Sequence, residues 1–206
     1  DLRGPVSRLA ERMERQGIEV IKLNTGNPAA FGFETPSPIL EALVRQAQMA
    51  AAYSSSQGIW EAREAICGYA ASRGIQGVTP ERVFTGNGVS ELIQLSLQAL
   101  LNPGDEVLIP TPDYPLWTAA VRLMGGTAVH YRCVEEQGWQ PDLADMEARI
   151  TRRTRAIVVI SPNNPTGAVY PSETLQKIAD LARRHQLLLM SDEIYDRLVM
   201  DGVACV

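Results

Sequence analysis

The chain has 206 residues, of which 45% are hydrophobic and 21% are charged, and its formal net charge is -5 at pH 7. These values are typical of one sizeable α/β domain or of a large part of a longer protein, and the acidic balance does not indicate the general attraction to phosphate that nucleic-acid-binding proteins show. No apolar run approaches the about 20 residues of a membrane-spanning helix, so we expect small molecules or a second copy of the chain as partners, and no nucleic acid or membrane.

The opening part of the chain combines helices with a loop rich in glycine and proline. Residues 1–15 are charged and helical in character, whereas residues 21–38 (IKLNTGNPAAFGFETPSP) hold several residues that interrupt regular structure. We therefore expect an extended arm or loop there. Helices are predicted at residues 38–49 and 59–73, the second from apolar side chains at roughly helical spacing, with the polar loop AAYSSSQG between them.

From residue 82 onward, predicted strands alternate with predicted helices. The strands are expected at residues 82–85, 106–110, 127–131, 155–160 and 187–190, and the helices at residues 89–101, 114–124, 142–150 and 172–185. This alternation predicts βαβ units and a mainly parallel sheet. Such a sheet is buried on both faces, which explains why AIVVI and LLLM are continuously apolar rather than alternating.

The unusual residues of the chain follow the predicted strands directly. They lie in the segments TGNGVS, PTPDYP, SPNNPTG and SDEIYD. Ligands of open α/β sheets bind beyond the carboxyl ends of the strands. We therefore expect the functional site at that edge of the sheet.

The segment TGNGVSEL places two glycines at a strand-to-helix turn. Backbone amides at Gly86 and Gly88 could approach an anion closely, and the start of a helix favours phosphate. The motif alone is weak, because it lacks the GK[ST] of a P-loop and has Glu91 where a dinucleotide fingerprint has its third small residue. A plain glycine turn is the alternative interpretation.

Two further turns display polar or aromatic side chains. Tyr114, on a turn stiffened by prolines, could stack on a planar ligand, although a tyrosine that starts a helix and packs on its neighbour is an equal alternative. In SPNNPTG, we interpret Asn163 as a structural residue of an Asx-type turn and Asn164 as the ligand contact.

The segment SDEIYD puts a carboxylate at the end of an apolar strand. Burying Asp192 without a positive charge or several donors would be costly, so a partner should meet it. Tyr195 adds a phenol three residues later. A flat aromatic ring with a phosphate, a basic ring nitrogen and a phenolic oxygen satisfies all four strand-end segments, and that ligand is pyridoxal 5'-phosphate.

Six segments in this order resemble a known family: LNTGNP, YSSSQG, TGNGVSEL, PTPDYPLW, SPNNPTG and SDEIYD. They are similar to the fold-type I pyridoxal-phosphate-dependent aminotransferases of class I and II, and in detail to bacterial glutamate–pyruvate (alanine) aminotransferases. The resemblance covers essentially the whole chain. It implies the three-layer α/β large domain of aspartate aminotransferase-like enzymes, here incomplete, with a mainly parallel sheet. It also implies transamination between an amino acid and a 2-oxo acid, with alanine/pyruvate and glutamate/2-oxoglutarate as substrates.

The resemblance assigns the residues around the cofactor ring. Asp192 would pair with the protonated pyridine nitrogen, while Tyr195 and Asn164 would hydrogen-bond the phenolic oxygen. Tyr114 would stack on the ring face. Asp192 and Tyr195 are thus the expected catalytic residues, and the cost of burying Asp192 is met by a pyridinium.

The remaining assignments concern the phosphate, the substrate and the partner subunit. Gly88, Val89 and Ser90 would cradle the phosphate, and Tyr53 would reach the phosphate of the neighbouring subunit in a homodimer. Gly26, together with Asn164, would contact the substrate. No metal is expected.

The chain lacks two residues that the family requires. Neither Lys22, in the predicted arm, nor Lys177, within a predicted helix, matches the lysine that forms the Schiff base with the cofactor. The arginine that grips the substrate carboxylate is absent too. We therefore expect residues 1–36 to be an N-terminal arm with part of a small domain, and residues 37–206 to be the cofactor-binding large domain, cut before the lysine, with the C-terminal small domain outside the chain.

Alternative functions on the same fold stay open at this point. One is the pyridoxal-phosphate-binding sensor domain of an aminotransferase-like transcription regulator, and another is an aspartate aminotransferase or a lyase. The three cysteines, Cys67, Cys133 and Cys205, are interpreted as reduced thiols of a cytoplasmic protein, and His130 and His185 as structural residues.

Overall fold

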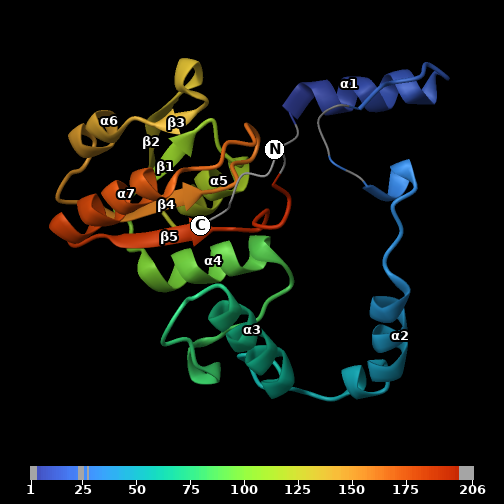
Figure 1. Cartoon of the computed structure of the whole chain (residues 1–206). Helices are drawn as coiled ribbons and strands as arrows, with labels where there is room; N and C mark the ends of the chain where they lie inside the picture. Colours follow the sequence, from blue (N-terminus) through green and yellow to red (C-terminus); the bar gives the residue numbers. More distant parts are fainter. Residues whose placement is uncertain (1–3, 23–25, 27, 200–206) are drawn as a thin grey trace. The chain divides into compact units, whose positions relative to one another are not determined.

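The computed structural model describes residues 4–22, 26 and 28–199. The chain divides into two compact units, Asp1–Phe84 and Thr85–Val206 (Figure 1), and each unit is described by itself. The predicted domain boundary after residue 36 stays a prediction.

The second unit is built on a mainly parallel sheet, as predicted. Its strands are β1 (Glu106–Thr111), β2 (Thr127–Val134), β3 (Gln140–Pro141), β4 (Thr154–Ile160) and β5 (Leu188–Asp192), in the spatial order β3-β2-β1-β4-β5. Strands β2, β1, β4 and β5 run parallel to one another. The short β3, which pairs antiparallel with β2, was not predicted from the sequence.

Helices cover both faces of this sheet and complete three layers (Figure 1). They are α4 (Val89–Leu100), α5 (Pro115–Leu123), α6 (Leu143–Ala148) and α7 (Ser172–Arg184), with a short 3-10 turn at η4 (Glu135–Gln137). Along β1, Val107 and Ile109 pack with α4 and α5, whereas Leu108 packs with α6 and α7. The alternation of side chains along a strand thus supplies one core to each face.

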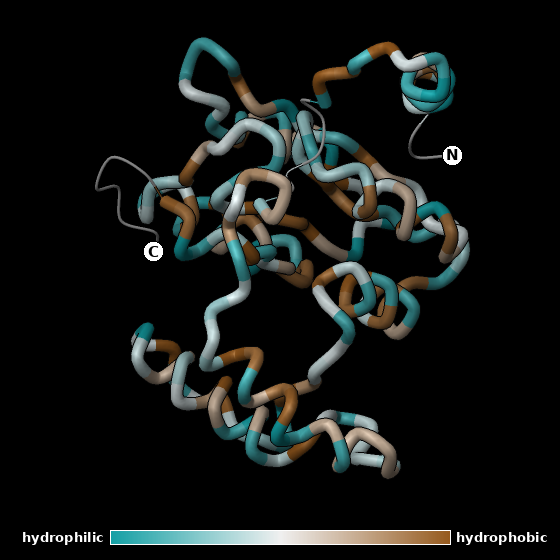
Figure 2. The backbone as a smooth tube through the Cα atoms, turned by 90° about the vertical axis from the view of Figure 1, so that its right-hand side faces the viewer, coloured by the Kyte–Doolittle hydropathy of each residue, from teal (hydrophilic) through white to brown (hydrophobic). Residues whose placement is uncertain are grey.

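The central strands are continuously apolar because their side chains enter a core on each face of the sheet. Residues 156–160 (AIVVI) of β4 are all buried, with Val158 in one core and Ile157 in the other, so the predicted burial on both faces is confirmed for this strand. Figure 2 colours each residue by its hydropathy, and hydrophobic and hydrophilic residues alternate along the helices. An amphipathic helix presents its apolar side to such a sheet.

The core beneath α6 and α7 contains two buried tyrosines and a thiol. The Tyr131 hydroxyl donates to the carbonyl oxygen of Val158 at 2.9 Å, and the Tyr170 hydroxyl lies 3.7 Å from the sulfur of Cys133. Burial, which disfavours the charged form, raises the pKa of Tyr131 and Tyr170 above the ordinary 10.0 and that of Cys133 above 9.0. These three groups are therefore neutral in the folded state well into the alkaline range.

Stability should fall at alkaline pH for this reason. A raised pKa lets the folded state keep a proton that the unfolded state releases, so the stabilisation is complete below the ordinary pKa and is lost as the pH rises above it. Tyr170→Phe should reduce this loss by on the order of 1 kcal/mol per pH unit above pH 10. Urea unfolding at pH 7.5 and at pH 11 measures it, with the exposed Tyr53→Phe as control. Identical losses in wild type and Tyr170→Phe would contradict the expectation.

One predicted strand is absent and the predicted burial of another, which does form, is wrong, for one physical reason. Residues 83–85 of the predicted strand 82–85 have no regular secondary structure, and Arg82 ends the 3-10 turn η3 (Pro80–Arg82). In β5, Leu188 and Leu189 are 50% and 42% exposed instead of buried. Within the described residues, β5 has a neighbour on one edge alone and residues 82–85 have no strand neighbour. A strand needs paired neighbours to form and covered faces to be buried.

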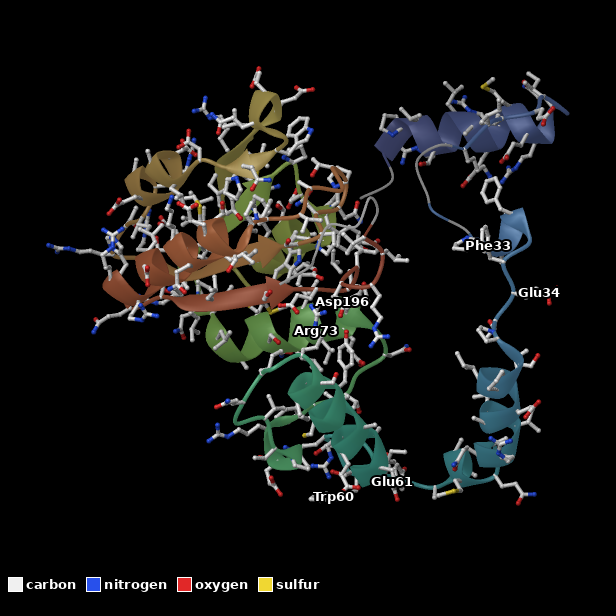
Figure 3. The ribbon with its side chains drawn as sticks, viewed as in Figure 1. Phe33, Glu34, Trp60, Glu61, Arg73 and Asp196 are labelled. Carbon is white, nitrogen blue, oxygen red and sulfur yellow. The ribbon has the colours of Figure 1, made fainter. Side chains whose placement is uncertain are left out.

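The first unit consists of short helices. They are α1 (Gly4–Arg15), η1 (Pro28–Phe31), α2 (Ser37–Gln46), η2 (Met49–Ala51), α3 (Trp60–Ser72) and η3. The predicted helices are confirmed, although α2 ends earlier than expected and the chain continues into η2. Phe33 and Glu34 lie on the extended segment before α2, as predicted for the arm (Figure 3).

Helix α3 is the packed element of this unit. Trp60 and Glu61 lie at its start (Figure 3), and the Arg63 guanidinium stacks 5.2 Å from the centroid of the Trp60 ring. Arg63 also donates to the side chain of Gln57 and to the carbonyl oxygen of Pro80, each at 3.0 Å. None of the helices in the described residues is long and apolar enough to cross a membrane.

Candidate functional site

Three neighbouring strands end beside one another at the carboxyl edge of the sheet. Strand β1 leads to Tyr114, β4 leads to Asn163 and Asn164, and β5 ends at Asp192 itself. Because β1, β4 and β5 are consecutive in the sheet and parallel, their carboxyl ends share one edge (Figure 1). The structure thus brings the residues of three predicted segments together where ligands of α/β sheets bind.

Asp192 is a buried carboxylate without a protein cation. It is 7% exposed, its Oδ2 accepts a hydrogen bond from the Trp117 indole at 3.0 Å, and its Oδ1 accepts one from the Ile194 amide at 3.4 Å. None of the described residues forms an ion pair with it. Burying an unpaired charge is costly. The site therefore fits a ligand that carries a positive charge, such as a protonated ring nitrogen.

Trp117 contacts Asp192 at this edge and was not singled out from the sequence. It lies in the first turn of α5, three residues after Tyr114, and is 3% exposed. A buried tryptophan needs an acceptor for its indole N–H, and this requirement is the signal that could have paired it with a strand-end carboxylate. The segment PTPDYPLW thus contributes two residues to the site.

The start of α4 has no side-chain cap. Gly88 is the N-cap residue, and no side chain caps the first turn, which begins with Val89 and Ser90. The Asn87 amide is engaged by the Glu91 carboxylate, which leaves the following amides for a ligand. Amides at the start of a helix bind phosphate well, so this turn fits the predicted role of Gly88, Val89 and Ser90, which stays a prediction.

Gly88 holds a backbone conformation that other residues avoid. Its φ of 83° and ψ of 170° lie in a region that only glycine populates readily. We expect Gly88→Ala to lower the free energy of unfolding by about 1–3 kcal/mol, measured by urea denaturation. Gly68→Ala is the control, because Gly68 lies inside α3, has open space for a Cβ and should gain stability slightly. Equal effects of the two substitutions would contradict this account of Gly88.

The two asparagines of SPNNPTG have different surroundings. Asn163 is buried, and its Oδ1 accepts hydrogen bonds from the amide and the hydroxyl of Thr166, at 3.2 and 2.9 Å. It is therefore a structural residue of the turn, as predicted. Asn164 is half-buried, and its side chain has no hydrogen bond with any residue that the structure describes. Its predicted ligand contact stays a prediction that this geometry permits.

Tyr114 and Tyr195 complete the edge. Tyr114 is the N-cap residue of α5, and its partly buried side chain packs against the core beneath α4 and α5. This packing is the structural alternative considered in the sequence analysis. A side chain that is only partly buried can also stack on a ligand. Tyr195 is half-buried, and its hydroxyl has no hydrogen bond in the described part of the chain. Their roles toward a ring remain predictions.

Gly26 and Tyr53 belong to the other compact unit and are described separately. Tyr53 is fully exposed, at 107% relative accessibility, and Gly26 is exposed with nothing within 4 Å of an added Cβ. The predicted contacts of Tyr53 with a partner's phosphate and of Gly26 with substrate stay predictions.

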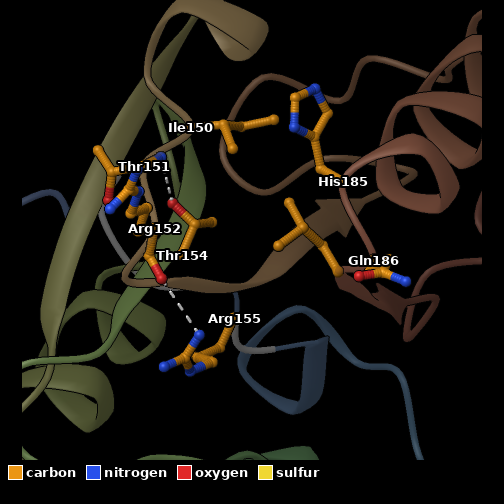
Figure 4. Close-up of a pocket in the computed structure, with 8 residues that line it drawn as sticks. Ile150, Thr151, Arg152, Thr154, Arg155, His185 and Gln186 are labelled. Atoms are coloured by element: carbon orange, nitrogen blue, oxygen red, sulfur yellow. Dashed lines mark hydrogen bonds between the residues drawn. The ribbon is translucent and has the colours of Figure 1, made fainter.

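A pocket of about 570 Å³ lies at the opposite edge of the sheet, before the first residues of β4 and β5 (Figure 4). Arg152, Arg155 and His185 are among its lining residues. The Arg155 Nε lies 3.0 Å from Asp105, and the Asn102 amide with Arg155 holds the pKa of Asp105 below its ordinary value. Because Arg155 and His185 already have acidic neighbours and the pocket lies at the opposite edge from Asp192, we do not assign it to the candidate site.

The described cysteines and histidines have the following surroundings. Cys67 is a half-buried and Cys133 a buried free thiol, and Cys205 lies outside the described residues. The Nε2 atom of His130 lies 2.8 Å from the Thr118 hydroxyl, and that of His185 lies 3.6 Å from Glu147. No group of three potential metal ligands occurs among residues 4–22, 26 and 28–199.

Comparison with known proteins finds extensive similarity in sequence. Residues 18–205 match the family described as aminotransferase class I and II. The chain is 54% identical to the glutamate-pyruvate aminotransferase AlaA of Haemophilus influenzae, over 98% of this chain and 50% of that protein. It is 56% identical to the alanine aminotransferase of Mycobacterium tuberculosis, over 98% of this chain and 47% of that protein.

Solved structures resemble the fold equally well. An aminotransferase from Escherichia coli matches with a TM-score of 0.97 and 53% identity, over 100% of this chain and 51% of that one. An aspartate aminotransferase double mutant of Thermus thermophilus matches with a TM-score of 0.90 and 38% identity, over 98% of this chain and 52% of that one. The chain spans about half the length of the curated relatives it matches.

Proposed function

The chain belongs to the class I and II aminotransferase family, and we propose that the protein of which it is part transfers an amino group between alanine/pyruvate and glutamate/2-oxoglutarate. The predicted family and the predicted aspartate aminotransferase-like α/β fold are thereby confirmed. The observation that carries the proposal is Asp192, a buried carboxylate at the carboxyl edge of the sheet with no cationic partner in the described part of the chain.

We propose pyridoxal 5'-phosphate as the cofactor of this edge. When bound, it supplies an electron sink for the bonds at the substrate α-carbon. Asp192 would accept the N–H of the ring nitrogen and balance its positive charge. The first-turn amides of α4, at Gly88, Val89 and Ser90, would bind the phosphate.

The remaining residues would fix the orientation of the ring. Tyr114 would lie against one face of it, and Asn164 and Tyr195 would hydrogen-bond its phenolic oxygen. The Asn164 amide and the Tyr195 hydroxyl have no hydrogen bond within the described residues, and both residues follow strands that end at this edge. These two observations support the assignment. A carboxylate, a stacking ring and two polar groups from different strands would restrict both translation and rotation of a planar ligand.

The names of the relatives support the choice of substrates. Relatives at 54% and 56% identity are a glutamate-pyruvate and an alanine aminotransferase, whereas an aspartate/prephenate aminotransferase is 39% identical. Gly26 and Asn164 would contact the substrate. We further propose a cytoplasmic homodimer, in which the fully exposed Tyr53 reaches the phosphate bound by the partner subunit.

A substrate panel on the full-length protein tests this function. We expect the fastest transamination with alanine and 2-oxoglutarate, compared with aspartate and aromatic donors. The 206-residue chain alone should not turn over, because neither Lys22 nor Lys177 matches the family's lysine. Equal or faster reaction with aspartate would contradict the alanine preference, and no transamination with any donor would contradict the function.

A further inference from the structure

Trp117 and Asp192 form a buried hydrogen bond across 75 positions of the sequence. The indole Nε1–H donates to Oδ2 of the carboxylate at 3.0 Å. Among the described residues, the second carboxylate oxygen, Oδ1, accepts only the longer 3.4 Å bond from the Ile194 amide. One oxygen of Asp192 is therefore firmly held, and the other is weakly engaged and free for a further donor.

The neutral indole of Trp117 can orient the Asp192 carboxylate without adding a positive charge beside it. An indole N–H is a donor only and has no acceptor. It orients a carboxylate and stabilises its ionised form, whereas a lysine or arginine at this position would neutralise it. The hydrogen bond from Trp117 therefore fixes the Asp192 carboxylate without placing a second charge beside it.

The fold fixes Trp117 itself. Helix α5 begins with Pro115, whose ring restricts the backbone, and the Trp117 amide donates to the carbonyl oxygen of Tyr114 at 3.1 Å. The indole belongs to the buried core with Leu97 and Ile160. One rigid turn thus carries both Tyr114, the expected stacking residue, and Trp117.

We propose that Trp117 is a positioning residue for the cofactor. It holds Oδ2 of Asp192, so that Oδ1 is the oxygen that accepts the N–H of the pyridine ring. Trp117 acts through Asp192, and the ring nitrogen keeps its proton to higher pH as a result. This inference rests on the proposed function, which supplies the ring.

Two variants of the full-length protein separate the N–H from the bulk of the side chain. Trp117→Phe keeps a buried aromatic ring and loses the donor. Trp117→His loses the fused six-membered ring but keeps an N–H at the equivalent place of its five-membered ring at pH 8. Trp139→Phe is the matched control, because Trp139 packs against the core on the other face of the sheet.

The measurement is ¹⁵N NMR of pyridoxal 5'-phosphate labelled at its ring nitrogen, with the dissociation constant from equilibrium dialysis. In Trp117→Phe we expect the protonation midpoint of the ring nitrogen to fall by about one pH unit and the affinity to fall about ten-fold, as for the loss of a hydrogen bond to a charged group. Trp117→His should lie between Trp117→Phe and wild type. Trp139→Phe should equal wild type.

The outcomes separate this inference from the proposed function. An unchanged ¹⁵N titration in Trp117→Phe, or equal losses in Trp117→Phe and Trp117→His, would overturn the positioning role and leave the function intact. If Trp117→Phe does not fold, Trp117→His decides: a ring-nitrogen titration close to wild type supports the role, and one shifted by a full unit overturns it. Failure of the wild-type protein to bind the cofactor would instead overturn the proposed function.

Discussion

Asp192→Asn in the full-length protein is expected to impair transamination about 10²–10³-fold, the range for removing a preorganised electrostatic partner of a reacting group. Asparagine keeps the shape of the side chain and can still accept the Trp117 hydrogen bond, but it lacks the negative charge. Without that charge, the ring nitrogen has no counter-ion at the carboxyl edge. The affinity for pyridoxal 5'-phosphate should fall with the rate.

The same substitution should have the opposite effect on the cofactor-free protein. Asp192 is buried, and within the described residues it accepts hydrogen bonds from two neutral donors, the indole of Trp117 and the amide of Ile194. Removing an unpaired buried charge removes its desolvation cost. We expect the free energy of unfolding of the cofactor-free protein to rise by about 1 kcal/mol or to stay unchanged.

Urea unfolding without cofactor and equilibrium dialysis with it measure the two effects. Asp180→Asn is the control, because Asp180 is a half-buried residue of α7 whose side chain is 48% exposed and pairs with Arg183 in the next turn. It should change neither quantity by more than a few tenths of a kcal/mol. A destabilised cofactor-free Asp192→Asn protein with unchanged cofactor affinity would show that Asp192 is structural.

Ile157→Ala is expected to be strongly destabilising, by about 3–4 kcal/mol. Ile157 is fully buried in β4, the strand between β1 and β5, and it packs in the core with α6 and α7. The substitution leaves a cavity between strand and helices that neighbouring side chains fill incompletely. Such a loss is a large fraction of the about 5–15 kcal/mol that stabilises a typical domain.

Leu188→Ala on the adjacent strand β5 is the matched control. Leu188 is 50% exposed, so its truncation should cost about 1 kcal/mol or less. Urea denaturation of the two variants measures the difference. Similar losses for both variants would show that the cores are packed differently from this description.

Sequence reasoning predicted the parts of this fold that depend on local pattern. The central apolar strands and the helices between them were recoverable because periodicity reports which faces are buried. The same reasoning failed for residues 82–85 and for Leu188 and Leu189, where the outcome depends on neighbouring strands. A pattern of apolar residues shows that a strand could form, and not whether a partner is present to pair with it.

The site shows the same division. Asp192 and Asn163 were identified because strand ends and prolines mark them in the sequence, and the turn-forming role of Asn163 is confirmed. The contact between Trp117 and Asp192 was missed, because it joins residues 75 positions apart and follows from how α5 lies on the sheet. Contacts between distant side chains require the tertiary structure.

The crystal structure of the full-length protein with pyridoxal 5'-phosphate tests the central claim most directly. We expect the pyridine nitrogen to lie within about 3.2 Å of Oδ1 of Asp192, while Oδ2 still accepts the hydrogen bond from the Trp117 indole. A ring nitrogen bound by a different side chain, or a cofactor bound away from the carboxyl ends of β1, β4 and β5, would contradict it.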